Sequence, residues 1–122
     1  MSYEDLKFKW ILGTTEVAIN KFEKVILCAK CIFHKELKGG FDTVKGGGEW
    51  HFDHENKEIL LYGESHDFGR ASIEDIKSVI LKNNIFNMRL VVNKKFDVSE
   101  YKFFYSESWF LSDAQQNKKP LN

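Results

Sequence analysis

Two glycine-bearing stretches could do chemistry through their backbone: GGG at residues 46–48 and GESHDFG at residues 63–69. Glycine allows tight turns and close approach, so that successive backbone N–H groups can converge on an anion. In the second stretch, Gly63 and Gly69 flank Ser65, whose hydroxyl would add a donor. The same glycines are also expected where a strand simply turns into a helix. The pattern therefore predicts either an anion site or two turns.

Cys28 and Cys31 form a CAKC motif, which invites a redox interpretation. Apolar residues at helical spacing predict a helix over residues 21–37, and both thiols fall in its middle. A redox motif instead needs its first cysteine at a helix N-terminus, where the helix dipole lowers the thiol pKa. We therefore expect free, buried structural thiols rather than redox or metal chemistry.

The segment HFDHEN combines histidines and carboxylates that could suggest a metal site. Alternation along a strand would send His51 and His54 to opposite faces, or the turn would expose both to solvent. We therefore expect polar hairpin residues here and no metal. No other motif indicates a cofactor, and none is expected.

Several strands must position these residues. Alternating apolar side chains predict a strand at residues 7–12, and turn residues predict a hairpin between residues 49–52 and 57–63. A further strand is expected over residues 86–93. The aromatic segment 101–110 is expected to form another strand or a flap, with core packing as the simplest role for its rings.

A second helix is predicted over residues 72–84, because Ser72 and Asp75 form a capping signal ahead of regularly spaced isoleucines. Residues 113–122 are polar and are predicted to be a disordered tail. The alternation of strands and helices indicates an α/β (α+β) fold. We expect a single domain over residues 1–112, with a mixed sheet of about six strands and two main helices packed on it.

The composition excludes several classes of protein. With 122 residues, of which 43% are hydrophobic, the chain can form one domain with a real core. Its 18 basic and 18 acidic residues cancel, so the overall charge predicts neither nucleic-acid nor membrane binding. The N-terminus lacks the basic and apolar regions of a signal peptide, and no apolar run is long enough to span a membrane. We therefore expect a cytoplasmic protein.

A wider pattern joins these motifs. GGG, thirteen further residues, YG-x-S-x-x-F-G-x-A and a capped helix follow one another, and FKW at residues 8–10 lies near the N-terminus. This arrangement resembles the phosphohistidine phosphatase (Janus/Ocnus) family over about residues 8–93. The resemblance implies a mixed sheet with a helix on each side. It also implies an anion site at the Gly63, Ser65 and Gly69 loop, with Lys9 as the functional lysine.

The chain departs from the family pattern at three positions. The family uses a histidine early in its first helix to activate water or to take the phosphoryl group, and that position is expected near Lys24 and Val25. His34 is predicted to lie about two and a half helical turns later. Glu49 replaces the basic residue after GGG, and Asp67 enters the loop, so both carboxylates would repel a phosphoryl group.

Substitutes for the missing chemistry are His66, which could act as acid or base beside Ser65, and Arg70, which could clamp a phosphate. On balance the sequence favours a non-enzymatic Janus-like protein, an accessory or regulatory binding protein of a bacterium or phage. Its partner would be another protein, contacted through the aromatic C-terminal segment, and a small anion such as phosphate could also bind. The alternative is a phosphohistidine or phospholysine phosphatase that uses His66 or His34.

Overall fold

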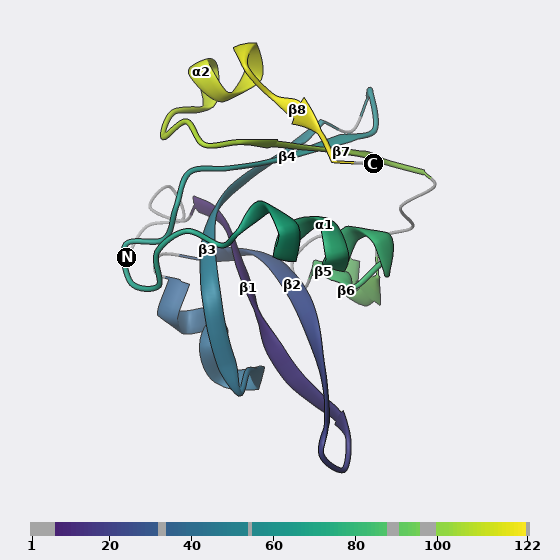
Figure 1. Cartoon of the computed structure of the whole chain (residues 1–122). Helices are drawn as coiled ribbons and strands as arrows, with labels where there is room; N and C mark the ends of the chain where they lie inside the picture. Colours follow the sequence, from purple (N-terminus) through teal and green to yellow (C-terminus); the bar gives the residue numbers. More distant parts are fainter. Residues whose placement is uncertain (1–6, 32–33, 54, 88–90, 96–99, 122) are drawn as a thin grey trace.

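The chain folds into one eight-stranded mixed sheet with the order β6-β5-β2-β1-β3-β4-β7-β8, shown in Figure 1. A computed structural model describes residues 7–31, 34–53, 55–87, 91–95 and 100–121. The strands are β1 (Lys7–Ala18), β2 (Lys21–Cys31), β3 (Thr43–Asp53), β4 (Glu58–Tyr62), β5 (Ile85–Asn87), β6 (Val91–Lys95), β7 (Lys102–Ser106) and β8 (Lys119–Pro120). The helices are α1 (Ile73–Leu81), α2 (Leu111–Gln116) and the 3₁₀ helix η2 (His34–Gly40). The expected α+β class is confirmed, with more strands than predicted.

The predicted helix over residues 21–37 is wrong, because residues 21–31 form β2. This strand pairs antiparallel with β1 along its whole length, and β5 pairs with its other side at Ile26. In such a central strand both faces are covered, so neighbours such as Val25 and Ile26 are both buried and the alternation that marks a strand is lost. Asn20 could have indicated the hairpin between β1 and β2, because its φ of 57° is typical of a tight turn.

Cys28 therefore lies in a strand rather than in a helix. Its thiol is free and fully buried, and burial raises its pKa well above the ordinary value. This agrees with the expected structural thiol. The side chain of Cys31 lies outside the described residues.

The α1 helix confirms the second predicted helix. The Ser72 hydroxyl accepts a hydrogen bond from the Asp75 N–H at 3.2 Å, and Ile76, Val79 and Ile80 are buried against the sheet. The predicted hairpin is also present, as the antiparallel pair β3 and β4. Residues 86–93 do not form one strand: β5 and β6 pair antiparallel to each other, and residues 88–90 lie outside the described residues.

The C-terminal residues are ordered elements rather than the expected disordered tail. The strand β8 pairs with β7, and Ala114 and Leu121 are buried. The helices α1 and α2 cover opposite faces of the sheet, as the packing of two successive residues of β4 shows. Leu61 joins the α1 core, whereas Leu60 joins the α2 cluster. One helix therefore lies on each side of the sheet, although α2 lies beyond residues 8–93, which the family resemblance covered.

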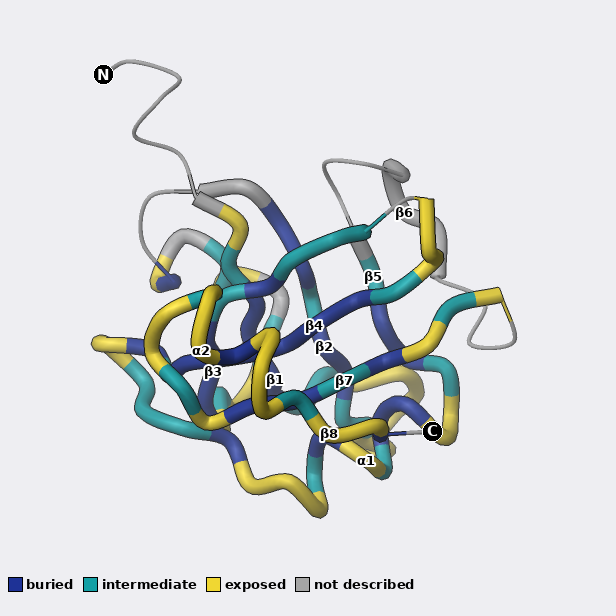
Figure 2. Tube along the Cα trace, turned by 90° about the horizontal axis from the view of Figure 1, so that it is seen from above, coloured by how far each residue is buried: buried dark blue, intermediate teal, exposed yellow. Residues whose placement is uncertain are grey.

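The core follows the central strands, which are the dark segments in Figure 2. Among the C-terminal aromatics, Phe103 and Tyr105 are buried, whereas Trp109 and Phe110 are exposed. No helix in the described ranges has both the length and the apolar character that a bilayer crossing requires.

Candidate functional site

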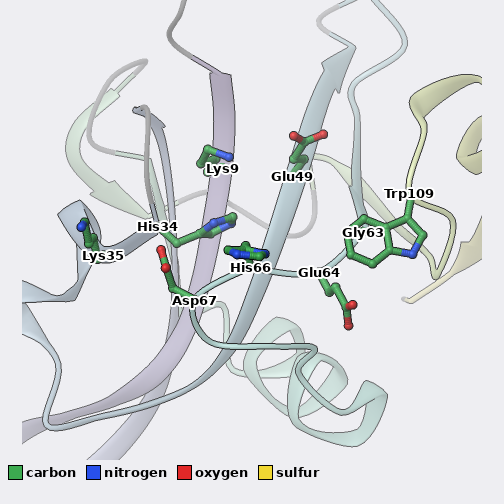
Figure 3. Close-up of a pocket in the computed structure, with 9 residues that line it drawn as sticks. All are labelled: Lys9, His34, Lys35, Glu49, Gly63, Glu64, His66, Asp67 and Trp109. Atoms are coloured by element: carbon green, nitrogen blue, oxygen red, sulfur yellow. The ribbon is translucent and has the colours of Figure 1, made fainter.

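A pocket of about 440 Å³ opens on the sheet, where four separate parts of the chain meet. They are β1, the beginning of η2, β3 and the loop after β4, joined by one residue that follows β7. Figure 3 shows the side chains gathered around this space. The lining residues are Lys9, His34, Lys35, Glu49, Gly63, Glu64, His66, Asp67 and Trp109.

Strand register places Lys9 in the pocket. Lys9 pairs directly with Glu49 across β1 and β3, so the two side chains lie on the same face of the sheet. The next residue of β1, Trp10, points to the other face and is fully buried in the core. Within the described part of the chain, the Lys9 ammonium forms no ion pair. Its charge is therefore available to an anion.

His34 is the most buried titratable side chain of the pocket, with 4% of its surface exposed. Its Nε2 lies 2.7 Å from the carbonyl oxygen of Gly48. A carbonyl can only accept, so Nε2 carries the hydrogen. Burial lowers the pKa of His34 below its ordinary value of 6.5, and the nearby Lys9 ammonium lowers it further. At neutral pH the ring is therefore neutral, and its Nδ1 has a free lone pair.

The count along the chain, which placed the family's histidine near Lys24 and Val25 and His34 about two and a half helical turns later, assumed a helix. Residues 21–31 instead form β2, and His34 begins η2. Lys24 makes a 2.6 Å ion pair with Asp75 on α1. Because β2 is extended and η2 then turns back, His34 reaches the GGG segment of β3. No local pattern could reveal this contact between residues fourteen positions apart.

The three glycines lie inside β3, so they form neither a turn nor an anion loop. A Cβ on Gly47 would lie 2.4 Å from the Trp10 carbonyl oxygen and 3.1 Å from the His34 ring. A Cβ on Gly48 would lie 2.3 Å from the Tyr62 carbonyl oxygen. The glycines therefore make room for neighbouring strands and for the imidazole.

The loop after β4 does contain the expected tight turn. Its closing bonds run from the Ser65 N–H to the Gly69 carbonyl at 3.1 Å and from the Gly69 N–H to the Ser65 carbonyl at 2.9 Å. The Ser65 hydroxyl accepts from the Phe68 N–H at 3.1 Å. Ser65 and Gly69 thus use their groups to hold the loop, and neither lines the pocket. Of the predicted anion-binding residues, the pocket contains Lys9 and Gly63.

Arg70 does not reach the pocket. Its guanidinium lies 3.6 Å from the Glu64 carboxylate and 3.2 Å from that of Glu107, and it also donates to the Glu107 carbonyl at 3.2 Å. These carboxylates engage the charge that would have clamped a phosphate. His66, the other substitute, does line the pocket and lies exposed at the tip of the loop.

Glu49 lies opposite Lys9 and is also held in place. The Tyr62 hydroxyl donates to its carboxylate, and the pKa of Tyr62 is raised, first by burial and then by the charge of Glu49. Sequence reasoning had not placed Lys35 or Glu64 in a site, although each follows a predicted site residue. Trp109 was expected only as part of the aromatic segment that would contact a protein partner, and it lines the pocket instead.

The expected absence of a metal site can be compared with the geometry only in part. His51 lies in β3, and His54 lies outside the described residues. Among the residues that are described, no group of three or more His, Cys, Asp and Glu side chains is arranged to hold a metal ion.

The fold and the pocket together define a class: a small α+β protein in which a neutral, buried histidine and a lysine line one pocket beside a glycine-rich strand. A family model, that of the Janus/Ocnus family (Ocnus), matches residues 5–88. The chain therefore belongs to the Janus/Ocnus family, as the motif spacing indicated. A search of curated proteins gives no match.

Proposed function

We propose that this protein hydrolyses the P–N bond of a phosphoramidate, such as a phosphorylated lysine or histidine side chain. The observation that carries the proposal is the neutral His34, which lines the same pocket as Lys9 and whose Nε2 hydrogen bond to the Gly48 carbonyl leaves the lone pair on Nδ1. The non-enzymatic interpretation depended on a missing histidine. His34, which lines the pocket, is a candidate for that histidine and supports the phosphatase alternative.

Each group has a role that its position suits. The Lys9 ammonium stabilises the charge on the phosphoryl oxygens. His34 Nδ1 takes a proton from a water molecule as the water oxygen attacks phosphorus. The P–N bond then breaks, and His66 gives a proton to the leaving nitrogen. The products are orthophosphate and a free amine, and proton exchange with solvent restores both rings.

The test is orthophosphate release from phosphoramidate and from a peptide containing phospholysine. A general base contributes about 10²- to 10⁴-fold, so His34→Asn should lower kcat by roughly that factor. Lys9→Met should give a comparable loss, and His66→Asn a smaller one. A matched control is His51→Asn, because His51 lies in β3 and does not line the pocket. It should leave the rate unchanged.

His34 is buried, so its variant must first be shown to be folded by amide NMR spectra. Lys9 is only half-buried, and Lys9→Met therefore tests the same site with less risk to the fold. Phosphate release that survives both substitutions would refute this assignment. The absence of any release by the wild-type protein would instead favour the second candidate, a non-catalytic binding protein. The exposed aromatic side chains of Trp109 and Phe110 suit that role.

A further inference from the structure

Most charges of the pocket are divided between its two sides, as Figure 3 shows, although Lys9 and Glu49 are neighbours across β1 and β3. We define the basic end as Lys9, His34 and Lys35, and the acidic end as Glu49, Glu64 and Trp109. Gly63 lies on the acidic side and has no side chain to fill the space. Asp67 is the exception, because its exposed carboxylate lies on the same side as His34.

The carboxylates of the acidic end are only partly neutralised. Among the described residues, the ion pair of Glu64 is with Arg70 at 3.6 Å, and Arg70 lies closer to Glu107, at 3.2 Å. Glu49 accepts a hydrogen bond from a neutral hydroxyl, that of Tyr62. These two carboxylates repel a phosphate dianion, so they disfavour a ligand that consists of phosphate alone. They are suited to a cation.

Trp109 adds a second feature that favours a cation. The chain has three tryptophans, and Trp10 and Trp50 are buried in the core. Trp109 is instead 57% exposed and lines the pocket. An indole face is the strongest aromatic partner for an ammonium or guanidinium group. Core packing therefore does not explain the indole ring at this position.

We infer that the natural ligand is bipolar: a phosphoryl group bound at the basic end and a positive side chain bound at the acidic end. The pocket volume of about 440 Å³ lies within the range for ligands of drug size, roughly 300–1,000 Å³, so it accommodates more than a phosphoryl group. The buried side chain of His34 is aimed into the same space. The substrate class is a phosphoramidate within a basic peptide segment; the phosphoramidate part rests on the proposed function.

The test uses two peptides of equal length, each with one phospholysine. In one peptide the neighbouring residues are arginine, and in the other they are glutamate. If the wild-type protein hydrolyses them, kcat/KM is compared. If it does not, dissociation constants are measured from tryptophan fluorescence, because Trp109 is the exposed indole among the three. Failure of the proposed hydrolysis and failure of the predicted preference for the basic peptide therefore give different results.

The basic peptide should be preferred by roughly tenfold, as expected when a partly exposed ion pair and a cation–π contact combine. Glu64→Gln and Trp109→Leu should each reduce this preference roughly three- to fivefold. Glu107→Gln is the matched control, because Glu107 shares Arg70 with Glu64 but does not line the pocket. Equal use of both peptides, or a preference that survives both pocket substitutions, would overturn the inference.

Discussion

A Cβ placed on Gly47 would lie 2.4 Å from a backbone oxygen, whereas a Cβ placed on Gly69 would meet no atom within 4 Å. Gly69 nevertheless has a φ of 77°, in the left-handed region, and Gly47 has no such φ. The sequence shows the same residue in both places, but the physical reasons differ. In β3 glycine provides space for packing, and in the loop it provides backbone conformation. A side chain added in β3 would collide with neighbouring strands, whereas one added at Gly69 would strain only the local backbone. Substitutions of glycine in β3 should therefore lower the free energy of unfolding more than substitutions in the loop.

The largest effect is expected from Gly47→Ala. The added methyl overlaps backbone atoms of β1 that cannot rotate away, so the free energy of unfolding should fall by about 3 kcal/mol or more. Urea unfolding measures this change. Gly39→Ala is the control, because a Cβ there meets nothing within 4 Å and should change stability by less than about 0.5 kcal/mol. If Gly47→Ala lowered the free energy of unfolding by less than about 1 kcal/mol, lack of space for a side chain would not explain this glycine.

A smaller loss is expected from Gly69→Ala, about 1–2 kcal/mol, because alanine in the left-handed region is strained although the methyl has room. Gly69→Asn should lose less, since asparagine tolerates this conformation better. The same unfolding experiment separates the two variants. If alanine and asparagine cost equally much, backbone conformation is not what selects glycine at this position.

Ser65→Ala tests whether side-chain hydrogen bonds hold the loop. It removes the acceptor for the Phe68 N–H and should cost about 1 kcal/mol. The exposed Ser112 gives a control, Ser112→Ala, with an expected change below about 0.5 kcal/mol. A neutral result for Ser65→Ala would mean that the two backbone bonds between Ser65 and Gly69 suffice.

The smallest effect is a pH dependence due to His34, which packs on the glycines of β3. Its pKa in the folded protein is lowered from 6.5, mainly by burial. As the pH falls below 6.5, the unfolded chain takes up a proton at this residue while the folded chain does not. The free energy of unfolding should therefore decrease until the pH reaches the folded pKa, and then level off.

Urea unfolding between about pH 5 and 8 measures this dependence. His34→Gln should flatten the part of the curve that His34 causes, and the control His51→Gln should leave it in place. An unchanged curve in the His34 variant would show that other groups cause the dependence.

The elements that could be predicted are those whose signals are local. Ser72 capping Asp75, followed by Ile76 and Ile80, predicts α1 from a few consecutive residues. The turn between β3 and β4 was equally visible. In contrast, β2 was mistaken for a helix because both of its faces are buried, and helical spacing then arises by coincidence. The C-terminal elements were missed because a buried Ala114 or Leu121 looks ordinary within a polar segment.

The candidate site shows the same division. Of the residues that were predicted to bind an anion, Lys9 and Gly63 line the pocket, whereas Ser65, Gly69 and Arg70 do not. The Ser65 hydroxyl accepts a hydrogen bond from within its own loop, and Arg70 pairs with Glu64 and Glu107. A sequence motif does not show whether a side chain contacts a ligand or another part of the protein.

The sequence by itself determined the family, the α+β class, the capped helix and the presence of a lysine, two histidines and several carboxylates near glycine-rich segments. Only the tertiary structure decided that His34 meets Gly48, that Arg70 is paired outside the pocket and that Trp109 lines it. The physical reason is that hydrogen bonding and packing between distant segments depend on how strands are ordered and paired. That order is fixed by burial of the whole core and not by any one stretch of residues.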